Sequence, residues 1–226
     1  MTKKLMVLAA GTLAALAFMA IPSIATAGEF VGTCSSGATC TGNVEGTGDA
    51  TLEDSGGLKI TCAATGGTAT QTNNSSTGTA KFIFTGCTES IFGTHCENTI
   101  TNGKIETNTM VSHNVILEAT PKVVGVLLTG ANVTFNCPTV FIKKTVTGNI
   151  IGEIVNPECG VQKPKSTFSF AAGATTGSQK WTQITTTGTA FDLTSNNDAG
   201  GAYATSSQTG IGHINWATGS AVRLDC

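Results

Sequence analysis

Eight cysteines constrain the fold of this 226-residue chain more than any other feature, because their number is even and all of them follow residue 33. They are Cys34, Cys40, Cys62, Cys87, Cys96, Cys137, Cys159 and Cys226. In an exported protein an even count predicts that every cysteine is paired in a disulfide bond. The spacing alone does not choose among the many pairings.

The N-terminus predicts export. Two lysines precede the apolar run 5–21, and Ala25-Thr26-Ala27 supplies the small residues that a signal peptidase accepts. We therefore predict a cleaved signal peptide of bacterial type at 1–27 and a secreted, extracellular mature chain at 28–226 without a transmembrane segment. The alternative is an uncleaved membrane anchor, because about 17 apolar residues nearly span a bilayer.

Metal binding is the competing use of the cysteines. No C-x-x-C pair occurs, and the three histidines, His95, His113 and His213, are scattered. We therefore predict neither a metal site nor a cofactor on these residues.

Strand parity gives three cysteines a place in the core. Alternate residues of a half-buried strand share a face, and Cys62, Cys137 and Cys226 each continue an alternating apolar series, such as Val133-x-Phe135-x-Cys137. We predict that these three are buried cystines and that Cys159, in a turn-like segment, pairs with one of them. Two short loops are predicted to close on themselves, through Cys34 with Cys40 and through Cys87 with Cys96.

Composition indicates strands. Only 12% of residues are charged, and Thr, Gly, Ser, Ala and Val dominate the chain after residue 27. We predict an all-β protein, an antiparallel sandwich or jelly-roll-like Greek key with disulfides, preceded by the helical signal peptide. The strand-like runs are 57–63, 79–85, 104–120, 122–129, 132–137, 139–155, 166–171, 180–187, 189–194, 212–217 and 221–226. The run 122–155 is predicted to be the best buried, and 66–78 and 195–201 to be long loops.

A break in the pattern at 157–165, which contains Pro157 and Pro164, predicts either a boundary between two β-domains or a surface loop within one.

Removal of 1–27 takes away two lysines and no acid, so the formal charge of −2 becomes −4. That charge, without basic clusters, argues against nucleic acid as a partner.

No compact catalytic motif is present, and we assign no catalytic residue. Neighbouring residues of a strand point to opposite faces, so His95 and Cys96 make a poor catalytic pair. Glycoside hydrolysis needs only two facing carboxylates, for which Glu106, Glu118 and Glu153 are candidates, although solvent-facing acids on strands are the ordinary case.

Two acidic loops raise the question of calcium. Asp49, Glu53 and Asp54 form one cluster, and Asp192, Asn196, Asn197 and Asp198 form the other. Neither has EF-hand spacing, and turn formation is the simpler role for these residues.

Three aromatic residues near the C-terminus are candidates for ligand binding: Trp181, Tyr203 and Trp216. Such rings serve as platforms for sugars. Trp216 shares parity with Ile214 and is predicted to face inward, whereas Trp181 is the better candidate for exposure.

The chain resembles uncharacterised exported β-rich, cystine-containing proteins of soil actinobacteria. The resemblance covers about residues 57–160 and rests on the signal, the segments 86–96, 123–128 and 146–152, and the strand end Phe135-Asn136-Cys137. It implies a secreted β-fold and brings no known activity.

Three functions remain open. The first is a non-catalytic structural or surface-associated protein, with a role in adhesion or assembly and a cell-surface component or polysaccharide as partner. The second is a carbohydrate-binding module that uses the exposed aromatic residues. The third is an extracellular glycoside hydrolase with paired carboxylates.

Overall fold

The computed structural model describes residues 28–99, 103–184, 188, 190–197 and 202–226, so the predicted signal peptide lies outside the described residues. The described residues form strands almost throughout. In chain order the elements are β1 (Val31–Cys34), β2 (Thr39–Gly46), β3 (Ala50–Asp54), β4 (Lys59–Thr72), β5 (Thr77–Glu89), β6 (Ile105–Glu106), β7 (Met110–Ala119), β8 (Lys122–Cys137), the 3-10 turn η1 (Pro138–Val140), β9 (Ile142–Ile154), β10 (Gln162–Lys163), β11 (Lys165–Phe170), β12 (Leu193–Asn196), β13 (Ala204–Trp216) and β14 (Val222–Asp225).

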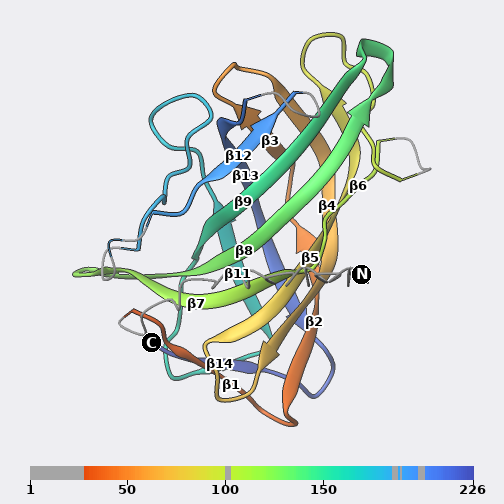
Figure 1. Ribbon diagram of the computed structural model, residues 1–226. Coiled ribbons are helices and arrows are strands. Elements are labelled where there is room, and N and C mark those ends of the chain that lie inside the picture. Colours follow the sequence, from red (N-terminus) through yellow and green to blue (C-terminus); the bar gives the residue numbers. More distant parts are fainter. Residues whose placement is uncertain (1–27, 100–102, 185–187, 189, 198–201) are drawn as a thin grey trace, which may run out of the picture.

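The larger sheet closes on itself (Figure 1). Strands β4, β5, β7, β8 and β9 pair in that order. Strands β11 and β12 then bridge β9 to β13, and β2 and β3 bridge β13 back to β4. Every pairing is antiparallel, so the predicted all-β antiparallel class is confirmed. The two packed faces expected of a sandwich are opposite walls of one continuous sheet.

The interior of the closed sheet is the main core, and strand parity determines what enters it. On β8, Val133, Phe135 and Cys137 are buried, whereas Asn132, Thr134 and Asn136 are exposed. Cys62 is buried on β4 in the same way. The predicted apolar parity is therefore confirmed for Cys62 and Cys137, and Cys226 is half-buried.

Three phenylalanines pack edge to face inside this core. Phe82 contacts Phe168 and Phe170 at ring-centroid distances of 6.4 and 6.3 Å, a geometry that suits the ring quadrupole. Beside them lies an apolar cavity of about 110 Å³, whose lining reaches the surface at Gly48 and Ile211.

A small sheet covers one end of the cylinder, at the bottom of Figure 1. It has the order β1-β14-β10 and holds Val222 against the Cys34–Cys40 disulfide. The Cys159–Cys226 disulfide links the residue that follows β14 to the segment between β9 and β10. The predicted Cys34–Cys40 bond is confirmed, and Cys159, predicted to pair with Cys62, Cys137 or Cys226, pairs with Cys226.

The outer face of β7, β8 and β9 is covered by the segment between β11 and β12. Ile184 and Phe191 of that segment pack on Val115, Leu127 and Ile151. The central strand β8 is consequently buried on both faces between residues 123 and 128, which explains its continuous apolar sequence. The prediction that 122–155 is the best buried region holds in this layer, where Val124, Leu127 and Ile151 are nearly inaccessible, but it is wrong for the connection between β8 and β9, where Phe141 is exposed.

The predicted Cys87–Cys96 bond is wrong, because Cys87 bonds to Cys62 and Cys96 bonds to Cys137. The register of β4 on β5 places Cys62 directly opposite Cys87. Cys96 lies beside Cys87 on its other side and donates its backbone N–H to the Cys87 carbonyl, at 2.9 Å. The spacing of cysteines along the sequence carries no information on such a register. All the described cysteines are paired.

Several predicted boundaries are also wrong. The expected loop 66–78 is the continuation of β4 and β5, and only 73–76 connects them. The runs 31–54 and 204–211 contain strands that polar composition concealed. Residues 180–184 form no strand, and 185–187 lie outside the described residues. The proline-rich segment 157–165 separates β9 from β11, which pair with each other in the same sheet.

Candidate functional site

The three predicted ligand-binding aromatics have different surroundings. Trp181 packs beside the outer apolar cluster, and its Nε1 donates to Glu153 Oε2 at 3.3 Å. Trp216 packs against the small sheet and donates to Ser166 Oγ at 3.1 Å. Tyr203 is exposed.

These rings do not share one surface. Tyr203 immediately precedes β13, and Trp216 is its last residue. A strand of 13 residues spans about 40 Å, so the two rings lie at opposite ends of the closed sheet. Trp181 lies on the outer face beside β9. The carbohydrate-binding function therefore remains a prediction to which this arrangement adds no support.

Two of the three candidate carboxylates are paired with lysines. Glu106 binds Lys81 at 2.5 Å and Lys104 at 3.4 Å, and their hydrogen bonds lower its pKa. Glu153 binds Lys180 at 2.8 Å, and this hydrogen bond is the main cause that lowers its pKa. A general acid for glycoside hydrolysis needs a raised pKa, so neither group is tuned for that role. Glu118 lies on β7.

One residue from each of the two acidic loops considered for calcium binding lies beside the Lys144 amine. Asp54 Oδ2 lies 2.5 Å from Lys144 Nζ, and Asn197 Oδ1 lies 2.7 Å from the same nitrogen. Glu53 instead pairs with Lys59. The ammonium group thus takes the position a cation would need. Within the described ranges no three metal-ligating side chains come together, and Asp198 falls outside those ranges.

Three apolar side chains that were not predicted as a site are exposed at one end of the closed sheet. Ile91, Phe92 and Phe141 are exposed by 59, 74 and 93%; we call these three residues the apolar tip. Ile91 and Phe92 belong to the turn that follows β5, and Phe141 follows η1 as its C-cap. Large exposed apolar groups of this kind mark contact surfaces.

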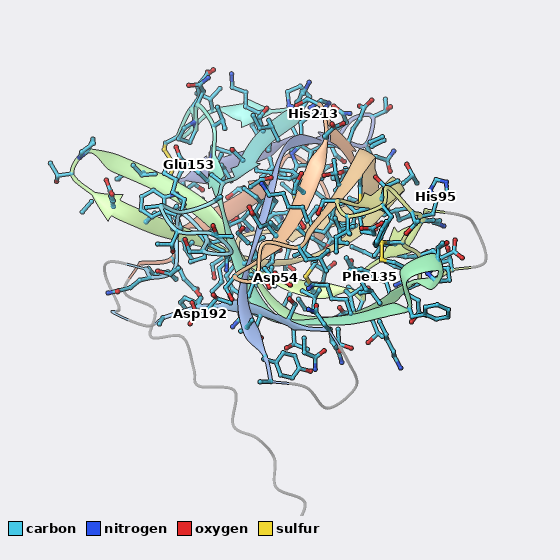
Figure 2. The ribbon with its side chains drawn as sticks, turned by 90° about the horizontal axis from the view of Figure 1, so that it is seen from above. Asp54, His95, Phe135, Glu153, Asp192 and His213 are labelled. Atoms are coloured by element: carbon cyan, nitrogen blue, oxygen red, sulfur yellow. A yellow bond between two sulfur atoms is a disulfide. The ribbon has the colours of Figure 1, made fainter. Side chains whose placement is uncertain are left out.

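The two turns of the apolar tip are tied together. The segment after the first turn pairs with β5 through Thr88 and His95, and Glu97 then pairs with Asn136 on β8. The Cys96–Cys137 disulfide closes this arrangement one residue further toward the tip. In the view of Figure 2, His95 and Phe135 lie on the same side of the molecule. The antiparallel register therefore puts both turns at the same end.

A buried carboxylate holds the first turn. Glu89 is 1% exposed and accepts the backbone N–H groups of Ile91, Phe92 and Thr94 at 2.5 to 3.1 Å. Burial raises the pKa of Glu89, but the hydrogen bonds from Thr94, Ile91 and Phe92 outweigh that effect and lower the pKa overall. The ionised Glu89 carboxylate therefore fixes the backbone of a turn whose apolar side chains are exposed to solvent.

The second turn is held in an uncommon backbone conformation. Phe141 has φ 55 and ψ 26, the left-handed region that bulky residues avoid. Its N–H donates to the Pro138 carbonyl at 3.2 Å, and its side chain points into solvent. An exposed side chain on a strained backbone is typical of functional sites. A signal was present in the sequence, since Ile91-Phe92 interrupts the otherwise polar segment between Cys87 and Cys96.

No family model, no curated protein and no solved structure matches this chain. Among the described residues no helix combines the length and the apolar character needed to cross a bilayer.

Proposed function

We propose that this protein is a non-catalytic extracellular protein of the cell surface, which adheres or assembles through the apolar tip. The observation that carries the proposal is the pre-organised exposure of Ile91, Phe92 and Phe141 on two turns held by Glu89 and by the Cys96–Cys137 disulfide. Rigid aromatic groups bind partners with little loss of conformational entropy. The tip therefore has the properties of a contact surface.

The remainder of the fold supports a structural role. Disulfides fasten the small sheet, the strands β4 and β5, and the base of the tip. The closed sheet leaves few free strand edges, which limits unspecific pairing with other chains. Such a scaffold suits a protein that must remain folded outside the cell.

The test compares two variants of the mature chain 28–226. In the first, Phe92→Ser and Phe141→Ser remove the aromatic groups of the tip. In the control, Val111→Ser removes an apolar residue of β7 that is 46% exposed. Both are assayed for self-association by analytical ultracentrifugation and for sedimentation with washed envelopes of the producing cells.

We expect the wild type and the control to self-associate or sediment, and the tip variant to lose at least tenfold in apparent affinity. Equal behaviour of the tip variant and the control would refute the role of the tip. A wild type that neither self-associates nor binds envelopes would refute the proposed function.

A further inference from the structure

Lys144 is a fully buried lysine on β9, with an exposed fraction of 0%. Parity directs it into the closed sheet, where Phe135 is its neighbour on β8. Burial of an ammonium group is costly unless it is paired and hydrogen-bonded. The partners of Lys144 are therefore informative.

Two groups of different chemistry meet at Lys144 Nζ. The first is the carboxylate of Asp54, on β3, whose side chain is 5% exposed and whose Oδ2 lies 2.5 Å away. Its other oxygen accepts the Leu58 N–H at 3.1 Å, which fixes the orientation of the carboxylate. The second group is the carboxamide of Asn197, whose Oδ1 lies 2.7 Å away.

Strand register explains why Asn197 is there. Asn196 of β12 pairs with Thr145 of β9, so the next residue of the antiparallel ladder stands opposite Lys144. A carbonyl bond is about 1.23 Å long, so Nζ lies within about 4 Å of the Asn197 Cγ carbon. That is close to the separation of about 3 to 3.5 Å from which an intramolecular attack proceeds.

We propose that Lys144 and Asn197 condense into an intramolecular isopeptide bond, with Asp54 as the proton relay. Asp54 takes a proton from the ammonium group along their hydrogen bond. The neutral Nζ then attacks Cγ of Asn197, the new C–N bond forms, and the C–N bond of the carboxamide breaks. Ammonia leaves.

The atoms and charges balance without any other reactant. Nζ gives up two of its three protons. One departs with the ammonia, and the other remains on Asp54, which ends as a neutral carboxylic acid. Asn197 is exposed as a residue, so ammonia has a direct path to solvent.

The reaction also has a physical driving force. It replaces a buried ion pair by a neutral amide and a neutral acid, and so removes the desolvation cost of two charges. The fixed positions of the amine and the carboxamide also make the attack effectively unimolecular, which lowers its barrier. The crosslink joins β9 to the end of β12.

Intact mass of the fully reduced mature chain tests this directly. We expect a mass about 17 Da below the sequence mass, the loss of one ammonia. Asn197→Ala is expected to restore the mass of its own sequence. As a matched control, Asn215→Ala replaces an asparagine that bonds Glu45 and should keep the loss.

A cyclic imide at an asparagine also loses ammonia, and two results separate it from the crosslink. Lys144→Arg abolishes the isopeptide bond and leaves an imide intact. Fragmentation after proteolysis yields a branched peptide that contains Lys144 and Asn197 only if the bond exists, and this result does not depend on the folding of any variant. A wild type of full sequence mass, or a mass loss without the branched peptide, overturns the proposal.

Discussion

The two disulfides of the small sheet should differ in their contribution to stability, and the difference tests what disulfides do in this fold. The perturbation is a pair of double variants, Cys159→Ala with Cys226→Ala and Cys34→Ala with Cys40→Ala. Both remove one covalent link from the same end of the molecule. The sequence separations of the linked residues are 67 and 6.

Two physical models predict opposite orders. If a disulfide acts by restricting the unfolded chain, closing a loop of 67 residues contributes about 4.4 kcal/mol and one of 6 residues about 2.2 kcal/mol. If packing dominates, the order reverses, because Cys34 and Cys40 are buried whereas Cys159 is exposed and Cys226 half-buried. We expect the first order, with a difference of about 2 kcal/mol.

Urea unfolding at equilibrium measures both free energies, with tryptophan fluorescence and circular dichroism followed together to verify a two-state transition. The slope of each transition must also be compared, because loss of a crosslink enlarges the unfolded ensemble. A larger loss of stability in the Cys34/Cys40 variant would refute the chain-entropy reasoning.

Three further predictions concern single residues. Glu89→Gln should lower stability by about 1.5 to 3 kcal/mol at neutral pH, because charge-assisted hydrogen bonds are lost. The pKa of Glu89 is lowered from 4.5, so the stabilisation by the ionised carboxylate is complete above that pH and is lost as the pH falls through the folded pKa. In urea unfolding, the stabilities of wild type and variant should therefore converge in acid. A difference that persists at low pH would contradict this. Gly67→Ala should lower the free energy of unfolding by about 1 to 3 kcal/mol, because φ is +144° and the new Cβ meets the Lys81 carbonyl. As its control, Gly48→Ala should be nearly neutral in the same assay, because its Cβ meets nothing within 4 Å. Leu128→Ala should lower the free energy of unfolding by about 2 to 5 kcal/mol, because it enlarges the core cavity. A smaller decrease in melting temperature than that of Gly67→Ala would contradict a rigid interior.

The sequence predicts the class of fold because its strongest signals are local. Alternation around Cys137 and Cys62 requires only that each strand have one buried face, and the structure has that property. The doubly buried part of β8 also follows from its continuous apolar run. These properties depend on composition within about ten residues.

What the sequence does not predict depends on pairing between distant segments. The Cys62–Cys87 bond follows from the register of β4 on β5, which no spacing rule contains. Strands such as β13 are rich in Ser, Thr and Gly, so their inward faces are too polar to show an apolar alternation. Their burial arises from the closure of the sheet.

The candidate sites illustrate the same limit. The apolar pair Ile91-Phe92 was visible in the sequence, but its position at the same end of the sheet as Phe141 follows from the Glu97–Asn136 pairing and the Cys96–Cys137 bond. Likewise, the sequence shows two acidic loops, but it does not show that Lys144 joins Asp54 to Asn197. A group's role becomes apparent only when its partner across the sheet is known.

The pairing of β2 and β3 with β13 has a consequence for biosynthesis. Glu45 and His213, which contact each other at 3.3 Å, are 168 residues apart. During synthesis β2, β3, β4 and β5 can pair early, but the other edge of β2 and β3 must wait until β13 has emerged. Folding that depends on such distant contacts is slow, and until β13 pairs, the free edge of β2 and β3 can pair with another chain and aggregate. Refolding yield should therefore fall steeply with protein concentration, and a cell that makes this protein in quantity needs a means of protecting that edge.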